Sequence, residues 1–562
     1  MLDETAQDLP GETMTGGMAI AAALIANRVD TVFGLPGAQM YPFFDALQQR
    51  SDRVRTIGAR HEQACGYMAF GYARSTGRPG VFAVVPGPGV LNAGAALCTA
   101  LGCNAPVLCV TGQVPSPFLG RGRGHLHELP DQLATLRGLT KWAARIERPA
   151  DAPRVIDEAF RQMLSGRPGP VAVEMAWDVM AGSEFVAPLA AARIEPALPP
   201  AARDIEAAAR VLISARQPMI MTGGGAQHAS EAVRALAEEL AAPVAAFRGG
   251  RGIMPEDHAL GLSSYAAHQL WPQVDVLVGI GTRLEMPYMR WSGMMTLIER
   301  PQAPPHLIRI DVDPAEMRRL VPHTPVVADA AAGSWALLEA VRKLRARTGG
   351  VAVERDLAPV AAAKAEAARA IRKVQPQMDY LDVIRAALPR DGLLVEELSQ
   401  VGFTSYFGYP VYEPRTYVSC GYQGTLGFGF QTALGVKAAH PGKPVVSITG
   451  DGGFLFGVQE LATAAQYGVG LVTLLFNNNA YGNVLRDQRL GFGNRVIGAA
   501  LENPDFMLLA KAFGVEGHRV ASPEALAPVL KEALKADRPV LIEITIAQGS
   551  EVSPWEFIHP KR

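Results

Sequence analysis

The chain has 562 residues, a formal net charge of −1 and a hydrophobic fraction of 49%, enough for roughly three to four domains with large cores. The balanced charge gives no basic surface that would attract nucleic acid and no acidic tail. Five cysteines without Cys-x-x-Cys spacing indicate buried reduced thiols in a cytosolic protein, not a disulfide framework or zinc site. The first residues are acidic and polar, so we expect residues 1–12 to be a loose leader without a secretory signal. The apolar run Met18–Ala26 is too short to span a bilayer.

The first part of the chain alternates helical and strand patterns, which predicts a doubly wound α/β domain over residues 13–186. Short apolar runs predict its strands, over Thr31–Gly34, Val54–Ile57, Val81–Val85 and Val107–Thr111. Each run is followed by a turn of glycine, proline or polar residues.

A Pro/Ala linker at 187–200 precedes a second alternating region, which predicts a middle domain over residues 201–345. Its expected elements are a helix near 203–214 and strands at Met219–Thr222 and near 243–247, 275–280 and 307–311. Ala346–Gln375 is typical of a connector with helical parts. A third domain is expected over residues 376–548, with Leu393–Leu398 as its first strand.

The third domain contains the most explicit pattern in the chain. The run Pro444–Thr449 predicts a buried parallel strand that ends at Gly450-Asp451-Gly452-Gly453. Helical spacing of apolar residues predicts a helix from Phe454 to Gly468, and Leu471–Phe476 predicts a second strand that ends at Asn477-Asn478-Asn479. Both polar turns therefore lie at the carboxyl ends of parallel strands, where open α/β sheets bind ligands.

These two turns suit a metal-bound diphosphate. Asp451 offers an anionic oxygen and Asn478 a neutral amide oxygen, a set that suits Mg²⁺ shared with phosphates. Gly452 and Gly453 let backbone N–H groups approach a phosphate closely at the start of a helix. A single Gly-Asp-Gly is an ordinary turn about as often as it is a phosphate site. Asn-Asn after a second strand favours the diphosphate site.

Gly450-Asp451-Gly452 with Asn477-Asn478 resembles the thiamine diphosphate motif. Nearly the whole chain is similar to the acetolactate synthase, pyruvate oxidase and benzaldehyde lyase branch of these enzymes. The resemblance implies three doubly wound parallel-sheet α/β domains, which are pyrimidine-binding, middle and diphosphate-binding. It implies thiamine diphosphate and Mg²⁺ as cofactors. The implied metal ligands are Asp451, Asn478 and the carbonyl oxygen of Ala480, and the implied cofactor contacts include Gly450, Asp451, Gly452, Gly453 and Asn478.

The resemblance implies further cofactor contacts in the third domain. Phe403 and Thr404 follow the first strand, where relatives touch the diphosphate. The carbonyl of Gly424 is expected to accept from the 4′-amino group, and Leu426 to be the apolar wedge that bends the cofactor. Plain core packing also suits Leu426, and the two roles are compatible.

Glu62 is the candidate catalytic residue of the first domain. In the family, a Glu at the Arg-His-Glu position binds N1′ of the aminopyrimidine, and a carboxylate in a partly desolvated cleft makes a strong hydrogen bond. Glu62 alone also suits the solvated first turn of a helix. The metal motif favours the catalytic role, and His61 is expected to face away.

Gly120–Gln132 (GRGRGHLHELPDQ) is flexible, basic and carries two histidines. The matching segment of relatives lines the substrate channel, which makes His127 a candidate catalytic residue by resemblance. Gln113 is a second candidate by resemblance, because it follows the strand that faces the thiazolium. His127 falls where relatives often have Gln, and Gln39 falls where some carboligases carry a working His, so the role of Gln39 stays open. A surface loop with solvated histidines is the alternative. Arg121 and Arg123 suit either an anionic substrate or an exposed position.

The middle domain departs from the flavin-binding pattern. FAD-binding relatives carry an Arg-x-Asp-Asp-Arg-like stretch after the strand near 275–280, where this chain has Arg283-Leu284-Glu285-Met286-Pro287. The turn Gly223-Gly224-Gly225 is weak support for a dinucleotide. FAD is therefore not favoured, and the acetolactate synthase assignment lacks one substrate-contacting Arg.

The resemblance implies an enzyme that makes or breaks C–C bonds of 2-oxo acids or aldehydes. The leading hypothesis is an acetolactate synthase-like carboligase or decarboxylase. A flavin-free, benzaldehyde lyase-like acyloin enzyme is the alternative, supported by the similar stretch Arg495–Asn503. A flavin-dependent pyruvate oxidase-like enzyme and a non-catalytic paralogue fit less well. In the family the active sites lie at subunit interfaces, so we expect a homodimer or homotetramer, with no nucleic acid or membrane partner.

Overall fold

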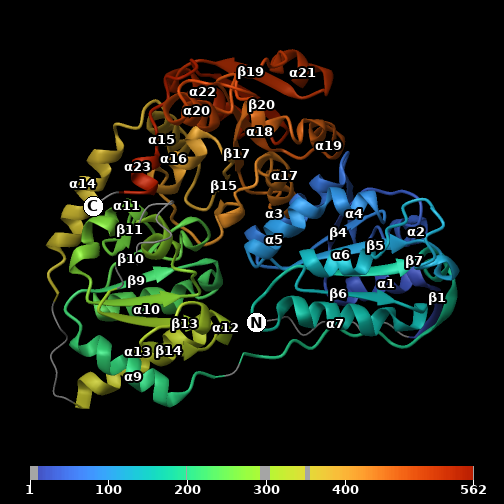
Figure 1. The fold of residues 1–562 in the computed structure, drawn as a ribbon, viewed down its shortest axis with the longest axis horizontal. Helices are drawn as coiled ribbons and strands as arrows, with labels where there is room; N and C mark the ends of the chain where they lie inside the picture. Colours follow the sequence, from blue (N-terminus) through green and yellow to red (C-terminus); the bar gives the residue numbers. More distant parts are fainter. Residues whose placement is uncertain (1–10, 198, 292–303, 348–354, 561–562) are drawn as a thin grey trace.

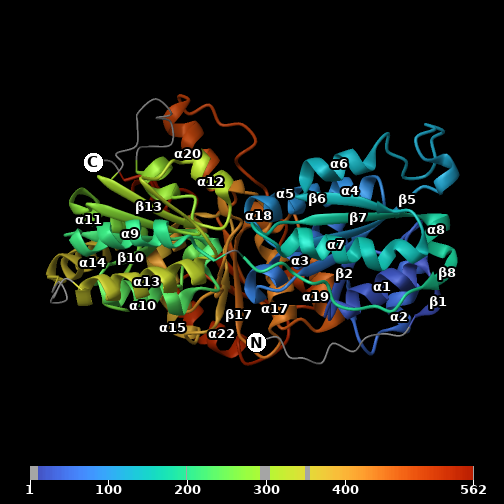
Figure 2. The same ribbon diagram turned by 90° about the horizontal axis from the view of Figure 1, so that it is seen from below.

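The computed structural model describes residues 11–197, 199–291, 304–347 and 355–560, so the leader expected over residues 1–12 lies almost wholly outside the described residues. The chain forms three six-stranded parallel sheets, each covered by helices, which confirms the three α/β domains inferred from the sequence. Figure 1 shows the first domain in blue, the middle domain in green and the third domain in orange and red. In Figure 1 the third domain lies across the top of the other two, and Figure 2 shows the same arrangement from below. No helix among the described residues is long and apolar enough to cross a membrane.

The sheet of the first domain has the strand order β3-β2-β4-β5-β7-β6. Its strands are β2 (Thr31–Gly34), β3 (Arg55–Gly58), β4 (Gly80–Val84), β5 (Val107–Gln113), β6 (Trp142–Ile146) and β7 (Val171–Ala176). Its helices are α1 (Gly16–Ala26), α2 (Tyr41–Gln49), α3 (Glu62–Thr76), α4 (Pro88–Asn92), α5 (Gly94–Gly102), α6 (Gln132–Leu139), α7 (Ala152–Leu164) and α8 (Trp177–Ala181). An antiparallel pair, β1 (Glu12–Thr15) and β8 (Ser183–Val186), joins the two ends of this domain.

The sheet of the middle domain has the order β11-β10-β9-β12-β13-β14. Its strands are β9 (Pro218–Thr222), β10 (Val244–Ala246), β11 (Gly261–Leu262), β12 (Val276–Ile280), β13 (His306–Asp311) and β14 (Thr324–Val327). Its helices are α9 (Ala202–Ser214), α10 (Ser230–Leu240), α11 (Ser264–Leu270), α12 (Pro314–Arg319) and α13 (Ala330–Arg347), and α14 (Ala358–Ile371) connects it to the third domain.

The sheet of the third domain has the order β16-β15-β17-β18-β20-β19. Its strands are β15 (Leu393–Val395), β16 (Tyr417–Val418), β17 (Val445–Gly450), β18 (Val472–Asn477), β19 (Glu516–Val520) and β20 (Val540–Thr545). Its helices are α15 (Gln377–Ala387), α16 (Gln400–Gly408), α17 (Gly429–Ala439), α18 (Asp451–Phe454), α19 (Leu461–Tyr467), α20 (Gly482–Gly491), α21 (Phe506–Ala512), α22 (Pro523–Ala533) and α23 (Trp555–Ile558). The central strands β17 and β18 are buried along almost their whole length, as their continuous apolar runs predict.

The first and third domains share one hydrophobic core, because α3 and α17 pack with their backbones in contact (Figure 1). A Cβ atom on Gly71 would lie 2.2 Å from the carbonyl oxygen of Thr432, and one on Gly435 would lie 2.0 Å from that of Met68. Only glycine permits so close an approach at both positions. The two domains therefore behave as one packed unit within the chain.

The helix expected from Phe454 to Gly468 is divided in the structure. The short helix α18 ends at Phe454, a 3₁₀ turn spans Val458–Glu460, and α19 begins at Leu461. The break places the carboxylate of Glu460, which is fully buried, against the first domain. A contact between domains thus overrides the local helical periodicity.

Candidate functional site

The two polar turns of the third domain meet at one edge of its sheet. Strands β17 and β18 are neighbours, and Gly450 pairs with Phe476, so the residues that follow them emerge side by side. The backbone N–H of Ala480 donates to Asp451 Oδ2 and to Asn478 Oδ1, both at 3.1 Å. The structure therefore brings Asp451, Asn478 and Ala480, the three expected metal ligands, within one hydrogen-bonded cluster.

Two residues that the sequence did not single out hold this cluster in place. The amide of Asn503 donates to Asp451 Oδ2 at 2.7 Å and to Asn477 Oδ1 at 3.0 Å. The amide of Asn478 donates to Glu551 Oε2 at 2.6 Å, which leaves Asn478 Oδ1 as its oxygen toward the metal position. The contacts of Asn503 with Asp451 and of Asn478 with Glu551 join residues more than 50 positions apart, so no local sequence pattern indicates them.

The charges of the cluster fit a divalent cation. Burial raises the pKa of Asp451, and burial also raises the pKa of Glu551, with the charge of Asp451 adding to it. The charge of Arg486 acts in the opposite direction on Glu551 and lowers its pKa. The carboxylate of Asp451 and the amide oxygen of Asn478 are hard oxygen ligands of the kind that Mg²⁺ prefers. A metal ion here would place positive charge beside the buried carboxylate of Asp451.

The glycine turn and the expected wedge lie against each other. A Cβ on Gly452 would lie 2.3 Å from the ring of Tyr481, so the turn is packed too closely for a side chain there. A Cβ on Gly453 would lie 3.4 Å from Leu426, which places the expected wedge next to the expected diphosphate turn. Gly424, at φ +56°, lies in the left-handed region at the start of the same loop.

A buried carboxylate fixes the loop that carries Leu426. Glu397 accepts hydrogen bonds from the backbone N–H groups of Leu398 (3.0 Å), Gly427 (3.1 Å) and Gly429 (2.7 Å). Burial raises the pKa of Glu397 to about 7. Sequence reasoning missed this residue because all three of its partners are backbone groups.

Phe403 and Thr404 are placed differently from the other expected cofactor contacts. Both lie on α16, where the hydroxyl of Thr404 donates to the carbonyl of Gln400 at 2.7 Å and is buried. The ring of Phe403 packs at 5.1 Å from that of Trp555. Neither side chain presents a polar group to the glycine turn.

The neighbouring Glu396 should make stability depend on pH. It is fully buried, and burial, with Glu397 beside it, raises its pKa to about 8. The folded state then holds a proton that the unfolded chain releases above its ordinary pKa near 4.5, so stability falls as pH rises from that value to about 8. We expect Glu396→Gln to unfold at least about 2 °C above the wild type at pH 9, with a smaller difference at pH 5. Thermal unfolding checks this, with the exposed Glu366→Gln as control; equal shifts at both pH values would contradict it.

In the first domain, Glu62 is the first residue of α3, at the carboxyl end of β3. His61 is the N-cap residue, and its Nδ1 accepts from the N–H of Gln63 at 3.2 Å, which gives this histidine the structural place expected of it. Glu62 is half-buried, and its Oε2 accepts from the amide of Asn92 at 3.0 Å. Its carboxylate is thus held at the sheet edge and remains reachable.

The turn that presents Glu62 is held by the third domain. Both carboxylate oxygens of Glu460 accept from the N–H of Arg60 at 3.1 Å, and the hydroxyl of Thr463 donates to Glu460 at 2.6 Å. The hydroxyl of Tyr467 accepts from the N–H of Gly58 at 2.9 Å. The break at Val458–Glu460 therefore serves to support the catalytic candidate of another domain.

Replacing Glu460 with Gln should lower turnover through Glu62. The amide keeps one acceptor but turns an NH₂ group toward Arg60 N–H, and a lost hydrogen bond of this kind costs roughly 1–3 kcal/mol. We expect about a tenfold lower kcat with cofactor affinity within about twofold of the wild type. Steady-state kinetics check this, with the exposed Glu532→Gln as control. Unchanged kcat would show that Glu460 does not support Glu62.

The other candidates of the first domain divide into two groups. His127 Nδ1 lies 2.8 Å from Gln39 Oε1. Gln113 is turned inward: its Oε1 accepts from Val114 N–H at 2.8 Å, and its Nε2 lies 3.4 Å from the buried carboxylate of Glu174. Arg121 and Arg123 are exposed. The structure therefore pairs His127 with Gln39 rather than with Gln113.

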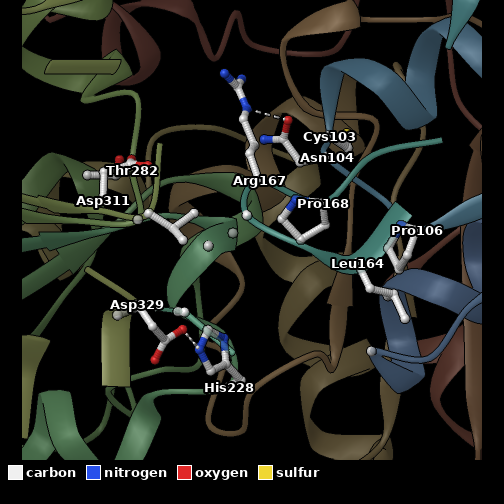
Figure 3. A pocket seen from close by; sticks show the side chains of 18 of the residues that line it. Cys103, Asn104, Pro106, Leu164, Arg167, Pro168, His228, Thr282, Asp311 and Asp329 are labelled. Atoms are coloured by element: carbon white, nitrogen blue, oxygen red, sulfur yellow. Dashed lines mark hydrogen bonds and ion pairs between the residues drawn. The ribbon is translucent and has the colours of Figure 1, made fainter. Parts of the chain in front are cut away.

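A cavity of about 470 Å³ lies between the first and middle domains, at the carboxyl ends of the middle strands. Figure 3 shows Arg167 donating to Asn104, at 2.9 Å, on one side of it, and His228 beside Asp329, at 2.7 Å, on the other. The hydrogen bond from His228 holds the pKa of Asp329 at about 2. The volume of the cavity suits a small-molecule site. The glycine turn packs closely on the neighbouring turn, since Cβ atoms on Gly223 and Gly225 would both meet Gly281.

Comparison with known proteins agrees with this geometry. The thiamine pyrophosphate enzyme models match in all three domains: the N-terminal TPP binding domain over residues 14–135, the central domain over 205–340 and the C-terminal TPP binding domain over 399–544. A probable acetolactate synthase large subunit of Methanocaldococcus jannaschii is 34% identical over 95% of this chain and 92% of its own. The probable 2-ketoarginine decarboxylase AruI of Pseudomonas aeruginosa is 34% identical over 95% of this chain and 94% of its own. The acetolactate synthase large subunit of Corynebacterium glutamicum is 32% identical over 97% of this chain and 88% of its own. The chain therefore belongs to the thiamine pyrophosphate enzyme family, and within it to the acetolactate synthase branch of carboligases and decarboxylases.

Proposed function

We propose that the protein makes or breaks C–C bonds of 2-oxo acids or aldehydes with thiamine diphosphate and Mg²⁺, as an acetolactate synthase-like carboligase or decarboxylase. The observation that carries this is the convergence of Asp451 and Asn478 on Ala480 N–H beside the Gly453–Leu426 contact. Bound there, the cofactor supplies a nucleophilic carbon and accepts the electrons released by bond cleavage. Asp451, Asn478 and the carbonyl of Ala480 would hold the metal, and Glu62 would hold the aminopyrimidine.

We propose that the enzyme works without FAD. Glu285 lies where flavin-binding relatives carry acidic residues, and here Arg290 Nε donates to it at 2.8 Å and Arg248 lies 3.4 Å away. Two guanidinium groups therefore already engage the carboxylate of Glu285. We expect the purified protein to be colourless. Visible flavin absorbance would overturn this and favour the oxidase-like alternative.

We propose a homodimer or homotetramer with the active sites between subunits. Glu62 and the Asp451 cluster lie at the edges of different sheets. Large apolar side chains follow the metal cluster on α20 and beyond it, and Leu490 (80% exposed) and Ile497 (81%) are uncovered in the single chain. Such a patch beside a site marks an interaction surface, and a second copy that carries Glu62 is the occupant we propose. The five free cysteines of the chain, three of them buried, support a cytoplasmic enzyme.

Turnover on a panel tests the proposed function. Purified protein with thiamine diphosphate and Mg²⁺ is given pyruvate, longer 2-oxo acids, 2-ketoarginine, benzoylformate and benzoin, with product analysis. Acetolactate from pyruvate supports the synthase-like activity, and decarboxylation of a longer 2-oxo acid supports the decarboxylase side of the same branch. Benzoin cleavage without turnover of 2-oxo acids favours the acyloin alternative, for which the missing Arg near Met286 is the specific observation. Binding of cofactor without turnover of any of them would contradict the substrate class.

A further inference from the structure

We propose that Gln39 and His127 form a hydrogen-bonded pair that fixes the tautomer of His127 and presents its Nε2 as the group that moves a proton at the substrate oxygen. The inference rests on the proposed function and names the acid–base group for its aldehyde or 2-hydroxyketone substrate. Gln39 comes from the turn after β2, and His127 from the loop before α6.

The hydrogen bonds decide which ring nitrogen carries the proton. The amide of Gln39 donates to the carbonyl oxygen of Leu126 at 2.9 Å, and because a carbonyl only accepts, Nε2 of Gln39 must face it. This turns Gln39 Oε1, also only an acceptor, toward His127 Nδ1 at 2.8 Å. His127 Nδ1 therefore carries hydrogen, and in the neutral ring Nε2 presents a lone pair.

Both members of the pair have a backbone conformation that L-residues rarely adopt. Gln39 has φ +66° and His127 has φ +67°. Each is held there by contact with a glycine: a Cβ on Gly112 would lie 2.4 Å from the carbonyl oxygen of Gln39, and one on Gly87 would lie 2.4 Å from that of His127. Strained backbone persists where the surroundings enforce it, and such sites are often functional. The strain here positions the two side chains that hydrogen-bond to each other.

One short turn connects the surroundings of the pair with those of Glu62. The turn from Gly87 to Gly89 touches His127 at one end, and at the other a Cβ on Gly89 would lie 3.6 Å from Glu62 Oε1. His127 and Glu62 thus flank one short turn. Gln39 is buried (3% exposed), whereas His127 is partly exposed and reachable by a substrate.

The proton step balances in both directions. When a C–C bond forms at an aldehyde carbon, the doubly protonated ring of His127 gives its Nε2 proton to the carbonyl oxygen, which becomes a hydroxyl. The ring is left neutral with hydrogen on Nδ1, and a proton from solvent restores the doubly protonated form. When a 2-hydroxyketone is cleaved, neutral Nε2 takes the hydroxyl proton as the carbonyl forms and the C–C bond breaks. Gln39 touches no substrate, so it is a positioning residue.

Three variants test the pair: His127→Ala, Gln39→Met and, as a matched control, His125→Gln. His125 lies on the same loop but packs against the ring of Phe118, at 4.0 Å. Kinetics are measured on a substrate that the wild type turns over, together with cofactor affinity. Independently of turnover, ¹⁵N-histidine NMR of the cofactor-free protein reports which nitrogen of His127 carries hydrogen, with the signal assigned by its loss in His127→Ala.

We expect His127→Ala to lower kcat by roughly 10²-fold with unchanged cofactor affinity, and Gln39→Met to lower it by about tenfold. The wild-type spectrum should show Nδ1–H, and Gln39→Met a mixture of both tautomers. His125→Gln should behave as the wild type. A Gln39→Met variant with the wild-type tautomer and kcat would overturn the pair, as would Nε2–H in the wild type. A wild type that turns over nothing on the panel overturns the proposed function, and the NMR result still decides the pair.

Discussion

Glu62→Gln is expected to lower turnover by roughly 10²- to 10⁴-fold while thiamine diphosphate still binds. The amide keeps the size of the side chain and still accepts from Asn92, which lies 3.0 Å from Glu62 Oε2. It cannot carry the negative charge that a strong hydrogen bond to the aminopyrimidine needs. Steady-state kinetics on a substrate from the panel, together with calorimetric titration of the cofactor, measure the two effects separately.

A matched carboxylate in the same domain controls for loss of charge. Glu158 lies on α7, away from the sheet edge, where its Oε1 accepts from Gln162 at 2.7 Å. Glu158→Gln should keep wild-type turnover. A Glu62→Gln enzyme within about twofold of the wild type would exclude Glu62 from the chemistry. It would then favour a first-turn residue that only interacts with the helix dipole.

The strands of the sheets were largely predictable because they are buried on both faces. A strand such as β18 must be apolar at nearly every position, so a continuous apolar run is enough to find it. The division of the helix expected over Phe454–Gly468 was not predictable. Its periodicity is real, but a contact between residues 400 positions apart, Arg60 and Glu460, decides where the chain bends. Similarly, the strand expected over Leu393–Leu398 ends at Val395, where two buried glutamates follow.

The same distinction applies to the site. Asp451 and Asn478 follow neighbouring strands, so local pattern brings them together before any coordinates are known. Asn503 and Glu551 are joined to them only by side-chain hydrogen bonds across long loops. The pairing of Gln39 with His127 depends on a left-handed backbone conformation at both residues. The sequence does not predict that conformation at residues other than glycine.

Asp451→Asn is expected to weaken thiamine diphosphate binding by about 100-fold or more and to remove its dependence on Mg²⁺. The substitution keeps an acceptor for Ala480 N–H, which lies 3.1 Å from Oδ2, but removes the only anionic ligand expected at the metal. Calorimetric titration of the cofactor with and without Mg²⁺ measures the effect. The exposed Asp391, paired with Lys443 at 3.0 Å, is the control in Asp391→Asn. Tight, Mg²⁺-dependent binding by Asp451→Asn would place the metal elsewhere.

Stability separates this loss from unfolding. Burial raises the pKa of Asp451, so in the cofactor-free protein its charge costs stability as pH rises from its ordinary value near 3.8 through the raised one, and the full cost is present at pH 8. Cofactor-free Asp451→Asn should therefore unfold at pH 8 at the wild-type temperature or above it. Cofactor and Mg²⁺ at 100 times their Kd should stabilise the wild type by about 2.7 kcal/mol and the variant by far less. A variant that is less stable than the wild type without cofactor would instead give Asp451 a structural role. The expected result means that the fold accepts a buried carboxylate without a counter-charge because the metal needs it.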